Sequence, residues 1–256
     1  MVNRIISICF LTFMAVSSIF FYIIALLIRI CTTPFDRRLV VLHMFTSFWA
    51  SLYLWIMPPW SVTTKGREKI KNGRVYMIIS NHQSQLDILA AHRLFFPFKW
   101  VSKAEVFKLP FIGWNMTLNQ YIRLERGRKK SIKKMMTKCE KTISNGSSVY
   151  FFPEGTRSST GIMRNFKSGA FQLAHKMKIP ILPIVINGSK NALPKHSVNF
   201  HGKHHIRIEV LDELSYESFS QLSPDETAQK VRNMIIEQVD EHMEIKQDRA
   251  DAPARG

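Results

Sequence analysis

The chain opens with two long apolar stretches. Residues 5–28 carry no charge, and a helix of that length would be about 36 Å long, against a bilayer core of about 30 Å. Residues 39–60 have no charge except a possible one on His43, and they include Trp49, Trp55 and Trp60. Tryptophan favours the membrane–water interface. We therefore predict that residues 1–60 form a membrane-anchoring helical segment.

Shorter apolar runs, alternating between strand-like and helix-like lengths, fill the rest of the chain. We predict strands over residues 75–80, 99–102, 120–123, 148–152, 181–186 and 206–211, and helices over 86–96, 128–143 and 168–176. This alternation predicts one α/β domain over residues 61–246, with a mostly parallel central sheet flanked by helices.

The end of this domain is marked by clear local signals. Residues 206–210 alternate between apolar and polar, which predicts a half-exposed, late or edge strand. A last helix should begin after Ser223, because a proline follows it and Glu226 can complete a capping box. The polar residues 247–256 predict a disordered tail.

The formal net charge of +17 indicates an anionic partner: nucleic acid, an anionic membrane or a phosphorylated substrate. The apolar N-terminus favours the membrane, where the basic run at residues 126–138 would attract anionic lipid. We find no recognisable nucleic-acid-binding motif and therefore expect no nucleic acid partner. The three cysteines are widely spaced, which is not typical of a disulfide framework or a zinc site.

The distribution of arginine predicts the orientation of the membrane segment. Arg29, Arg37 and Arg38 lie in the link between the two apolar stretches, and the positive-inside rule places that link in the cytoplasm. If both stretches spanned, the remaining domain would lie outside. We therefore expect the second stretch to lie in the interface or to dip into one leaflet, with the first either spanning or pairing with it as a half-embedded hairpin. The α/β domain should then face the cytoplasm.

Residues 81–87, Asn-His-Gln-Ser-Gln-Leu-Asp, join a predicted strand to a predicted helix. If Asp87 accepts the Nδ1–H of His82, Nε2 is left free to act as a general base. Positions five apart on a helix differ by about 140°, so His82 must precede the helix and Asp87 must stand in its first turn. The alternative is turn chemistry alone, with Ser84 and Asp87 serving to start the helix.

A second polar segment follows the predicted strand at residues 148–152. Glu154, Gly155, Thr156 and Arg157 stand where α/β folds bind ligands, and the arginine fork matches phosphate oxygens. This arrangement favours a phosphate cradle, and the alternative is a turn with an exposed arginine. Lys103 directly follows the predicted strand at residues 99–102, Arg123 ends the predicted strand at residues 120–123, and Lys167 lies just before a predicted helix.

Taken together and in order, these motifs resemble the glycerolipid acyltransferase family. They are Asn81-His82 with Asp87, Lys103 with Glu105, Pro110 and Gly113, Arg123, Phe152-Pro153-Glu154-Gly155-Thr156-Arg157, Phe166-Lys167-Ser168-Gly169-Ala170, and Ile179-Pro180-Ile181-Leu182-Pro183. The resemblance is strongest to the 1-acylglycerol-3-phosphate O-acyltransferases and covers residues 65–211. His82 and Asp87 alone are a weak signal, but the pair followed about 70 residues later by the Glu154–Arg157 motif is highly specific.

The resemblance implies a role for each matching residue. His82 would deprotonate the free hydroxyl of lysophosphatidic acid, with Asp87 orienting it, and the alkoxide would attack acyl-CoA or acyl-carrier protein without an acyl-enzyme. Arg157, with Gly155 and Thr156, would hold the acceptor phosphate, and Glu154 would shape that loop. Lys103 and Arg123 would contact the phosphate or the tetrahedral oxyanion.

The resemblance implies no metal or redox cofactor. It leaves two alternatives open: an acyltransferase for another lysophospholipid or lyso-aminolipid, and a non-enzymatic basic protein that binds membrane surfaces.

Overall fold

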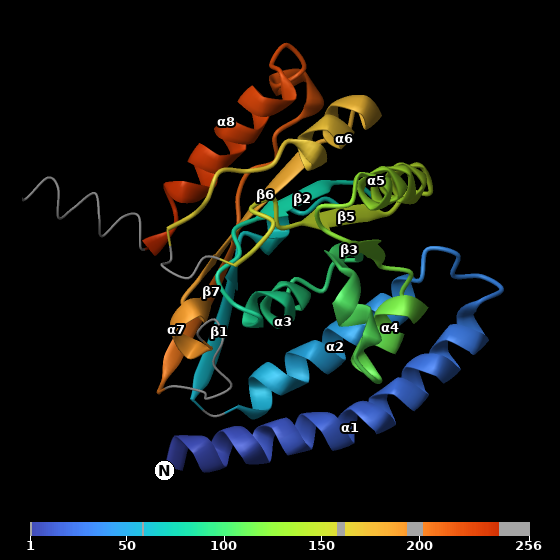
Figure 1. Ribbon diagram of the computed structural model, residues 1–256, viewed down its shortest axis with the longest axis vertical. Coiled ribbons are helices and arrows are strands. Elements are labelled where there is room, and N and C mark those ends of the chain that lie inside the picture. The colour runs from blue at the N-terminus through green and yellow to red at the C-terminus, as the bar shows by residue number, and fades with distance from the viewer. Residues whose placement is uncertain (1, 58, 158–161, 194–201, 241–256) are drawn as a thin grey trace, which may run out of the picture.

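Seven strands within the described residues form one sheet, shown in Figure 1. The computed structural model describes residues 2–57, 59–157, 162–193 and 202–240. The strands are β1 (Trp60–Lys65), β2 (Met77–Ser80), β3 (Phe98–Lys103), β4 (Ile122–Leu124), β5 (Ser148–Phe151), β6 (Ile181–Asn187) and β7 (His204–Val210). The α-helices are α1 (Val2–Thr32), α2 (Val40–Ile56), α3 (Leu86–His92), α4 (Ile112–Leu118), α5 (Lys129–Ser144), α6 (Gly169–Met177), α7 (Ser189–Ala192) and α8 (Pro224–Ile236). Short 3₁₀ turns are η1 (Arg67–Lys69), η2 (Ala104–Lys108) and η3 (Tyr216–Ser218).

The strands are ordered β1-β7-β6-β2-β5-β3-β4, and every neighbouring pair is parallel except β6 with β7. All residues of β2, β5 and β6 are buried, which is expected of parallel strands covered on both faces. The predicted α/β architecture is therefore confirmed. Because β2, β5, β3 and β4 run in the same direction, the segments that follow them all leave the sheet at one edge.

Two hydrophobic cores lie on opposite faces of this sheet. One core joins the face carrying Phe98 and Trp100 to helices α2 and α3. The other joins the opposite face to α5, α6 and α8 through residues such as Phe171 and Val231. Figure 1 shows these helices on either side of the strands. Apolar burial of this kind is the main stabilising contribution in a domain of this size.

Three expectations about the elements need correction. Strand β1 precedes the first strand that we predicted, at residues 75–80, and its alternating exposure gives only a weak strand signal. It pairs with β7, so β7, although half-exposed as predicted, is not the edge strand. Helix α3 ends at His92, earlier than the apolar run suggested, because β3 begins six residues later. The predicted capping box at Ser223 is confirmed.

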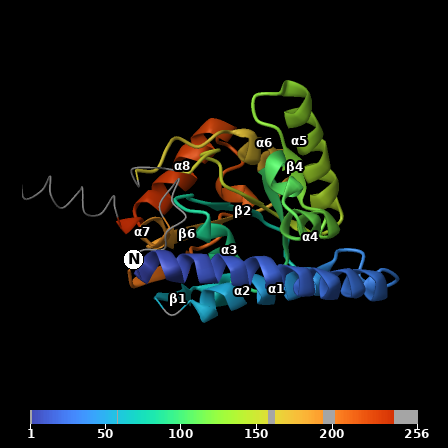
Figure 2. The ribbon, with the colours of Figure 1, turned by 60° about the horizontal axis from the view of Figure 1, so that its bottom comes forward.

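The N-terminal helices form a hairpin against the domain. Among the described residues, one helix, at residues 5–32, is long and apolar enough to cross a membrane. Helix α2 has 17 residues, about 25 Å of length, and its buried face packs on α3 and β1. The Tyr53 hydroxyl of α2 joins it to α1 by hydrogen bonds with Ser17 (3.0 Å) and Ser18 (3.2 Å). Figure 2 shows α1 and α2 lying side by side along one side of the domain.

Candidate active site

The turn after β2 is locked to the neighbouring strand by Asn81. Its side-chain amide donates to the carbonyl of Ile186 at 2.8 Å, and its Oδ1 accepts the Ile186 N–H at 2.9 Å. These two hydrogen bonds replace backbone–backbone sheet pairing at the point where the chain leaves β2. The backbone position of His82, the next residue, is thereby fixed at the carboxyl edge of the sheet.

His82 and Asp87 meet as their spacing required. His82 stands before α3, and Asp87 lies in its first turn. The Nδ1 of His82 lies 2.9 Å from Oδ2 of Asp87. With the Nδ1 proton directed at a carboxylate, the other ring nitrogen, Nε2, is left as a proton acceptor. The His82 side chain keeps 12% of its surface exposed, whereas that of Asp87 has none.

Asp87 also organises the turn itself. Its Oδ2 accepts the backbone N–H groups of Gln83 (2.7 Å) and Ser84 (2.9 Å). Ser84 is not the N-cap of α3: Gln85 holds that position, and the Ser84 hydroxyl donates to the carbonyl of Leu193 at 2.8 Å. Asp87 therefore stabilises the turn before α3, as the alternative interpretation predicted, and it contacts His82 as well.

Ser189 is a member of the site that the sequence did not reveal. Its hydroxyl donates to Oδ1 of Asp87, and the residue is fully buried. It begins α7, directly after β6 and the turn at Gly188, whose φ is +78°. In the sequence, the only sign of this role is that Gly188 and Ser189 follow a predicted buried strand, at the same sheet edge as His82. The contact with Asp87 depends on the pairing of β6 with β2, which sequence spacing does not show.

The loop after β5 contacts His82 from the other side. The ring of Phe152 stacks on the imidazole with centroids 4.0 Å apart. Glu154 accepts the backbone N–H of His82 through Oε1 at 2.8 Å and that of Arg164 through Oε2 at 3.0 Å. Burial raises the pKa of the Glu154 carboxyl, and these two N–H donors act in the opposite direction. Glu154 is thus a buried brace that joins the loop to the histidine turn.

Gly155, Thr156 and Arg157 continue this loop. Gly155 has a φ of +73°, a conformation that favours glycine, and its N–H donates to the carbonyl of Phe152 at 3.1 Å. Thr156 and Arg157 follow it and are partly exposed. Because β5 is the neighbour of β2, the loop places hydroxyl and guanidinium donors at the same edge as His82. Residues 158–161 lie outside the described residues.

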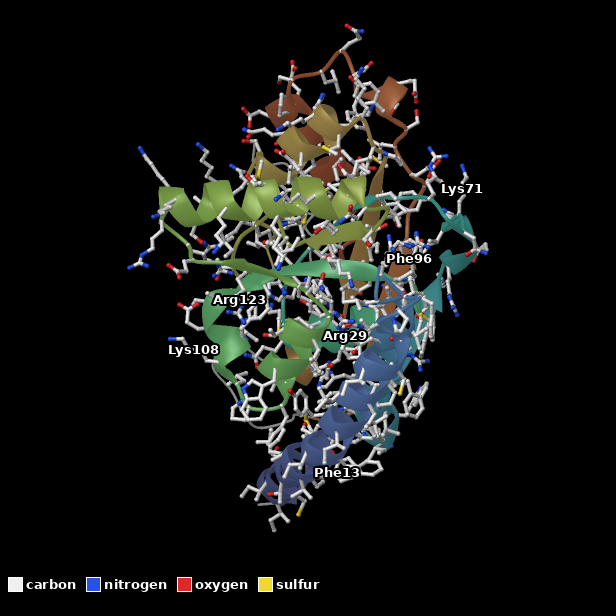
Figure 3. All side chains as sticks on the ribbon, turned by 90° about the vertical axis from the view of Figure 1, so that its right-hand side faces the viewer. Phe13, Arg29, Lys71, Phe96, Lys108 and Arg123 are labelled. Atoms are coloured by element: carbon white, nitrogen blue, oxygen red, sulfur yellow. The ribbon has the colours of Figure 1, made fainter. Side chains whose placement is uncertain are left out.

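Lys103 and Arg123 lie at the same edge but on strands farther away, since the order is β2-β5-β3-β4. Lys103 forms an ion pair with Glu105 at 3.3 Å, and both side chains are largely exposed. Arg123 donates to the hydroxyl of Thr117 at 2.9 Å and stacks over the ring of Phe107 at 4.7 Å. Figure 3 shows Arg123 and Lys108 on the same side of the molecule, near α4. The structure brings His82, Asp87 and Glu154 into one contact network, and it leaves these two cations at its margin.

In chemical terms, the site offers a buried carboxylate, a partly exposed imidazole, and basic groups along one sheet edge. That combination fits a general base acting next to an anionic substrate. Within the described part of the chain, no cluster of three or more His, Cys, Asp or Glu side chains could hold a metal ion.

Comparison with known proteins adds a second line of evidence. A family model described as Acyltransferase matches residues 61–187. The chain is 31% identical over 90% of its length to a chloroplastic 1-acyl-sn-glycerol-3-phosphate acyltransferase of Brassica napus, covering 66% of that protein. It is 36% identical over 70% of its length to a 1-acyl-sn-glycerol-3-phosphate acyltransferase of Saccharomyces cerevisiae, covering 60% of that protein. The chain thus spans no more than about two thirds of these two relatives.

A solved structure has the same fold. The crystal structure of a 1-acyl-sn-glycerophosphate acyltransferase from Thermotoga maritima superposes with a TM-score of 0.76, at 22% sequence identity, over 95% of this chain and 96% of the other. The similarity includes the helical N-terminus as well as the sheet, because nearly the whole of both chains is covered.

Proposed function

The chain belongs to the acyltransferase family, and from that premise we propose that it makes phosphatidic acid. The acyl group would move from acyl-CoA or acyl-carrier protein to the free hydroxyl of 1-acylglycerol 3-phosphate. The observation that carries this proposal is the contact of His82 with Asp87 at 2.9 Å, braced by Glu154 from the loop that bears Arg157. The curated relatives named as 1-acyl-sn-glycerol-3-phosphate acyltransferases support the choice of acceptor.

The proposed reaction needs one proton acceptor and no covalent enzyme intermediate. Nε2 of His82 takes the proton of the glycerol hydroxyl as the oxygen attacks the thioester carbonyl. The tetrahedral intermediate then collapses, the carbon–sulfur bond breaks, and the departing thiolate receives that proton from the imidazolium. Asp87 stabilises the imidazolium, because a carboxylate 2.9 Å away favours the charged ring. The reaction as proposed calls on no metal or redox cofactor.

Donors around the site would hold the acceptor phosphate and the developing oxyanion. We assign the phosphate to Arg157 with the hydroxyl of Thr156 and the backbone at Gly155, since a guanidinium can bind two phosphate oxygens at once. Lys103 and Arg123 would contact the phosphate or the oxyanion from the neighbouring strands. To bind substrate, Lys103 would break or rearrange its ion pair with Glu105, and Arg123 its hydrogen bond to Thr117.

The N-terminal hairpin would hold this site at a membrane. Helix α1 presents exposed apolar side chains such as Val16, Phe20 and Ile30, each more than 60% exposed. The apolar surface continues onto the α4 region through Trp114, which contacts Tyr22 of α1 at 5.5 Å. Because α1 lies along the domain (Figure 2), the half-embedded alternative fits better than a perpendicular span. We propose that the domain faces the cytoplasm, and Arg37 and Arg38 between the two helices support this by the positive-inside rule.

A test of the proposed function compares wild type with His82→Ala in purified membranes. With acyl-CoA or acyl-carrier protein and lysophosphatidic acid supplied, His82→Ala should form phosphatidic acid at least about a hundredfold more slowly, the usual contribution of a general base. His205→Ala is a matched control, because His205 is an exposed histidine on β7 that bonds only Ser61 and Thr63 among the described residues. Full activity in His82→Ala would refute the general-base role.

Assays on the same membranes distinguish the two alternatives, another acceptor lipid and a protein without enzyme activity. Competition among lysophosphatidic acid, lysophosphatidylcholine and lyso-aminolipids tests whether another acceptor is preferred. Arg157→Ala should raise the KM for the acceptor if its phosphate binds there, and an unchanged KM would count against that contact. A basic membrane-surface protein without activity would bind anionic vesicles in a salt-sensitive way but transfer no acyl group from any donor.

A further inference from the structure

The side chain of Lys167 lies against the turn that carries the proposed phosphate site. Its backbone N–H donates to the carbonyl of Pro153 at 3.0 Å, which ties the start of α6 to the loop after β5. A methyl group placed on Gly155 would lie 3.0 Å from Nζ of Lys167, 3.1 Å from its Cε and 3.5 Å from its Cδ. The lysine stem therefore occupies the space beside residue 155, and its ammonium ends at that turn.

Glycine at position 155 consequently has two causes. Its φ of +73° would strain any residue with a Cβ. In addition, a Cβ at this position would displace the ammonium of Lys167 from the turn. Not every glycine with positive φ meets a lysine in this way: Gly73 and Gly127 have no atom within 4 Å of such a Cβ, and at Gly66 and Gly188 the nearest atom is a backbone carbonyl oxygen.

No acidic partner accounts for the position of this ammonium within the described residues. Other exposed lysines form ion pairs, such as Lys103 with Glu105 and Lys176, in the last turn of α6, with Glu140. Lys167 forms none with the described residues. The nearest carboxylate in sequence, Glu154, already uses both oxygens to accept backbone N–H groups.

Two cations therefore border one short turn, Lys167 beside Gly155 and Arg157 two residues farther along the loop. Their mutual repulsion is relieved when an anion binds between them. An ammonium offers three donors to phosphate oxygens, whereas the guanidinium offers a fixed fork, so the two groups complement each other on one phosphate.

We propose that Lys167 binds a substrate phosphate monoester at the Gly155 turn, as a binding residue additional to Arg157. This inference rests on the proposed function, and it names a residue that the histidine–aspartate chemistry does not require. The phosphate is either that of lysophosphatidic acid or the 3′-phosphate of CoA. Both present the same chemistry to an ammonium, and kinetics separates them.

The test uses the full chain in detergent, with Lys167→Met, Lys167→Arg and the control Lys133→Met. Methionine retains the apolar stem against Gly155 and removes only the charge, and Lys133 is an exposed lysine of α5. If the acceptor phosphate is bound, Lys167→Met raises the KM for lysophosphatidic acid about tenfold, the cost of one hydrogen bond to a charged group. Its kcat stays close to wild type, Lys167→Arg recovers most of the affinity, and monoacylglycerol, which lacks the phosphate, is used equally by both proteins.

If the bound phosphate belongs instead to the donor, the KM for acyl-CoA rises in Lys167→Met, and the KM for the 3′-dephospho form does not. Either pattern supports the proposal. Unchanged KM values for both substrates in Lys167→Met would overturn it. Absence of phosphatidic acid synthesis by wild type with every acyl donor would instead refute the proposed function. Calorimetric binding of lysophosphatidic acid and of CoA needs no turnover, and equal affinities in wild type and Lys167→Met would overturn the inference in that case also.

Discussion

Replacing Asp87 by asparagine should separate the catalytic effect of its charge from its structural effect. The carboxylate accepts three N–H groups on Oδ2, from His82, Gln83 and Ser84, and a hydroxyl from Ser189 on Oδ1. In Asp87→Asn, the amide oxygen takes the place of Oδ2 and still accepts the three N–H groups. The amide nitrogen then faces Ser189, whose hydroxyl rotates to accept. The turn is therefore retained while its negative charge is lost.

The size of the effect follows from the geometry. Unit charges separated by the 2.9 Å between Nδ1 and Oδ2 attract by about 6 kcal/mol at an effective dielectric constant of about 20. The imidazolium is only partly formed in the transition state, so we expect a loss of about 3–6 kcal/mol. This corresponds to a fall in kcat of about 10²- to 10⁴-fold. The KM for the acceptor should change little, because Asp87 is fully buried.

The assay follows phosphatidic acid formation from lysophosphatidic acid at saturating acyl donor, alongside thermal unfolding of the same samples. Asp87→Ala provides the comparison: it leaves the N–H groups of Gln83 and Ser84 without a buried acceptor, at about 1–3 kcal/mol each. Asp87→Ala should therefore unfold at a lower temperature than Asp87→Asn. The reasoning is refuted if Asp87→Asn keeps more than about a tenth of the wild-type kcat, or if its activity falls only as far as its stability does.

Three further predictions concern neighbouring groups. Ser189→Ala removes the hydroxyl donor to Oδ1 of Asp87, so kcat should fall about tenfold at unchanged acceptor KM; a wild-type kcat would show that this contact does not support the base. Glu154→Gln sets an amide N–H₂ against one of the two N–H groups that the carboxylate accepts, and it should lower the free energy of unfolding by about 1–3 kcal/mol, which thermal or denaturant unfolding measures against wild type. Burial lowers the pKa of His92 from 6.5 to about 3. Between these two pH values the unfolded chain binds a proton at His92 that the folded chain does not. The free energy of unfolding is therefore highest above pH 6.5 and should fall by about 2 kcal/mol on going to pH 5. His92→Gln, which cannot titrate, should show a smaller acid loss in unfolding experiments, and an identical pH dependence would contradict the assignment.

The sequence predicted most of the sheet because parallel strands buried on both faces appear as continuous apolar runs. Strands β2, β5 and β6 coincide closely with such runs. Strand β1 was missed because only every second side chain is covered, and its polar positions resemble a connector. The shortened α3 was missed for a different reason: the apolar residues after His92 fill the core between α3 and β3, so apolarity continued where the helix did not.

For the candidate site, local spacing predicted that His82 and Asp87 could meet if His82 preceded the helix and Asp87 stood in its first turn, and the structure shows that contact. Ser189 and Lys167 required the tertiary structure. Ser189 reaches Asp87 only because β6 pairs with β2, and Lys167 reaches Gly155 only because the start of α6 is hydrogen-bonded back to Pro153. The first contact depends on strand order and the second on a hydrogen bond between a loop and a helix start, and apolar patterning encodes neither.

The sequence alone determined that this protein has an apolar N-terminal helix, a mostly parallel α/β sheet and an ordered set of family motifs. These properties follow from local periodicity and short-range spacing, which the chain carries in consecutive residues. The tertiary structure decided that Glu154 braces the histidine turn, that Lys103 and Arg123 stand at the margin of the site, and that α1 lies along the domain. Each of these depends on which strands and helices become neighbours. The neighbours are determined by burial of apolar side chains throughout the core and not by any single segment.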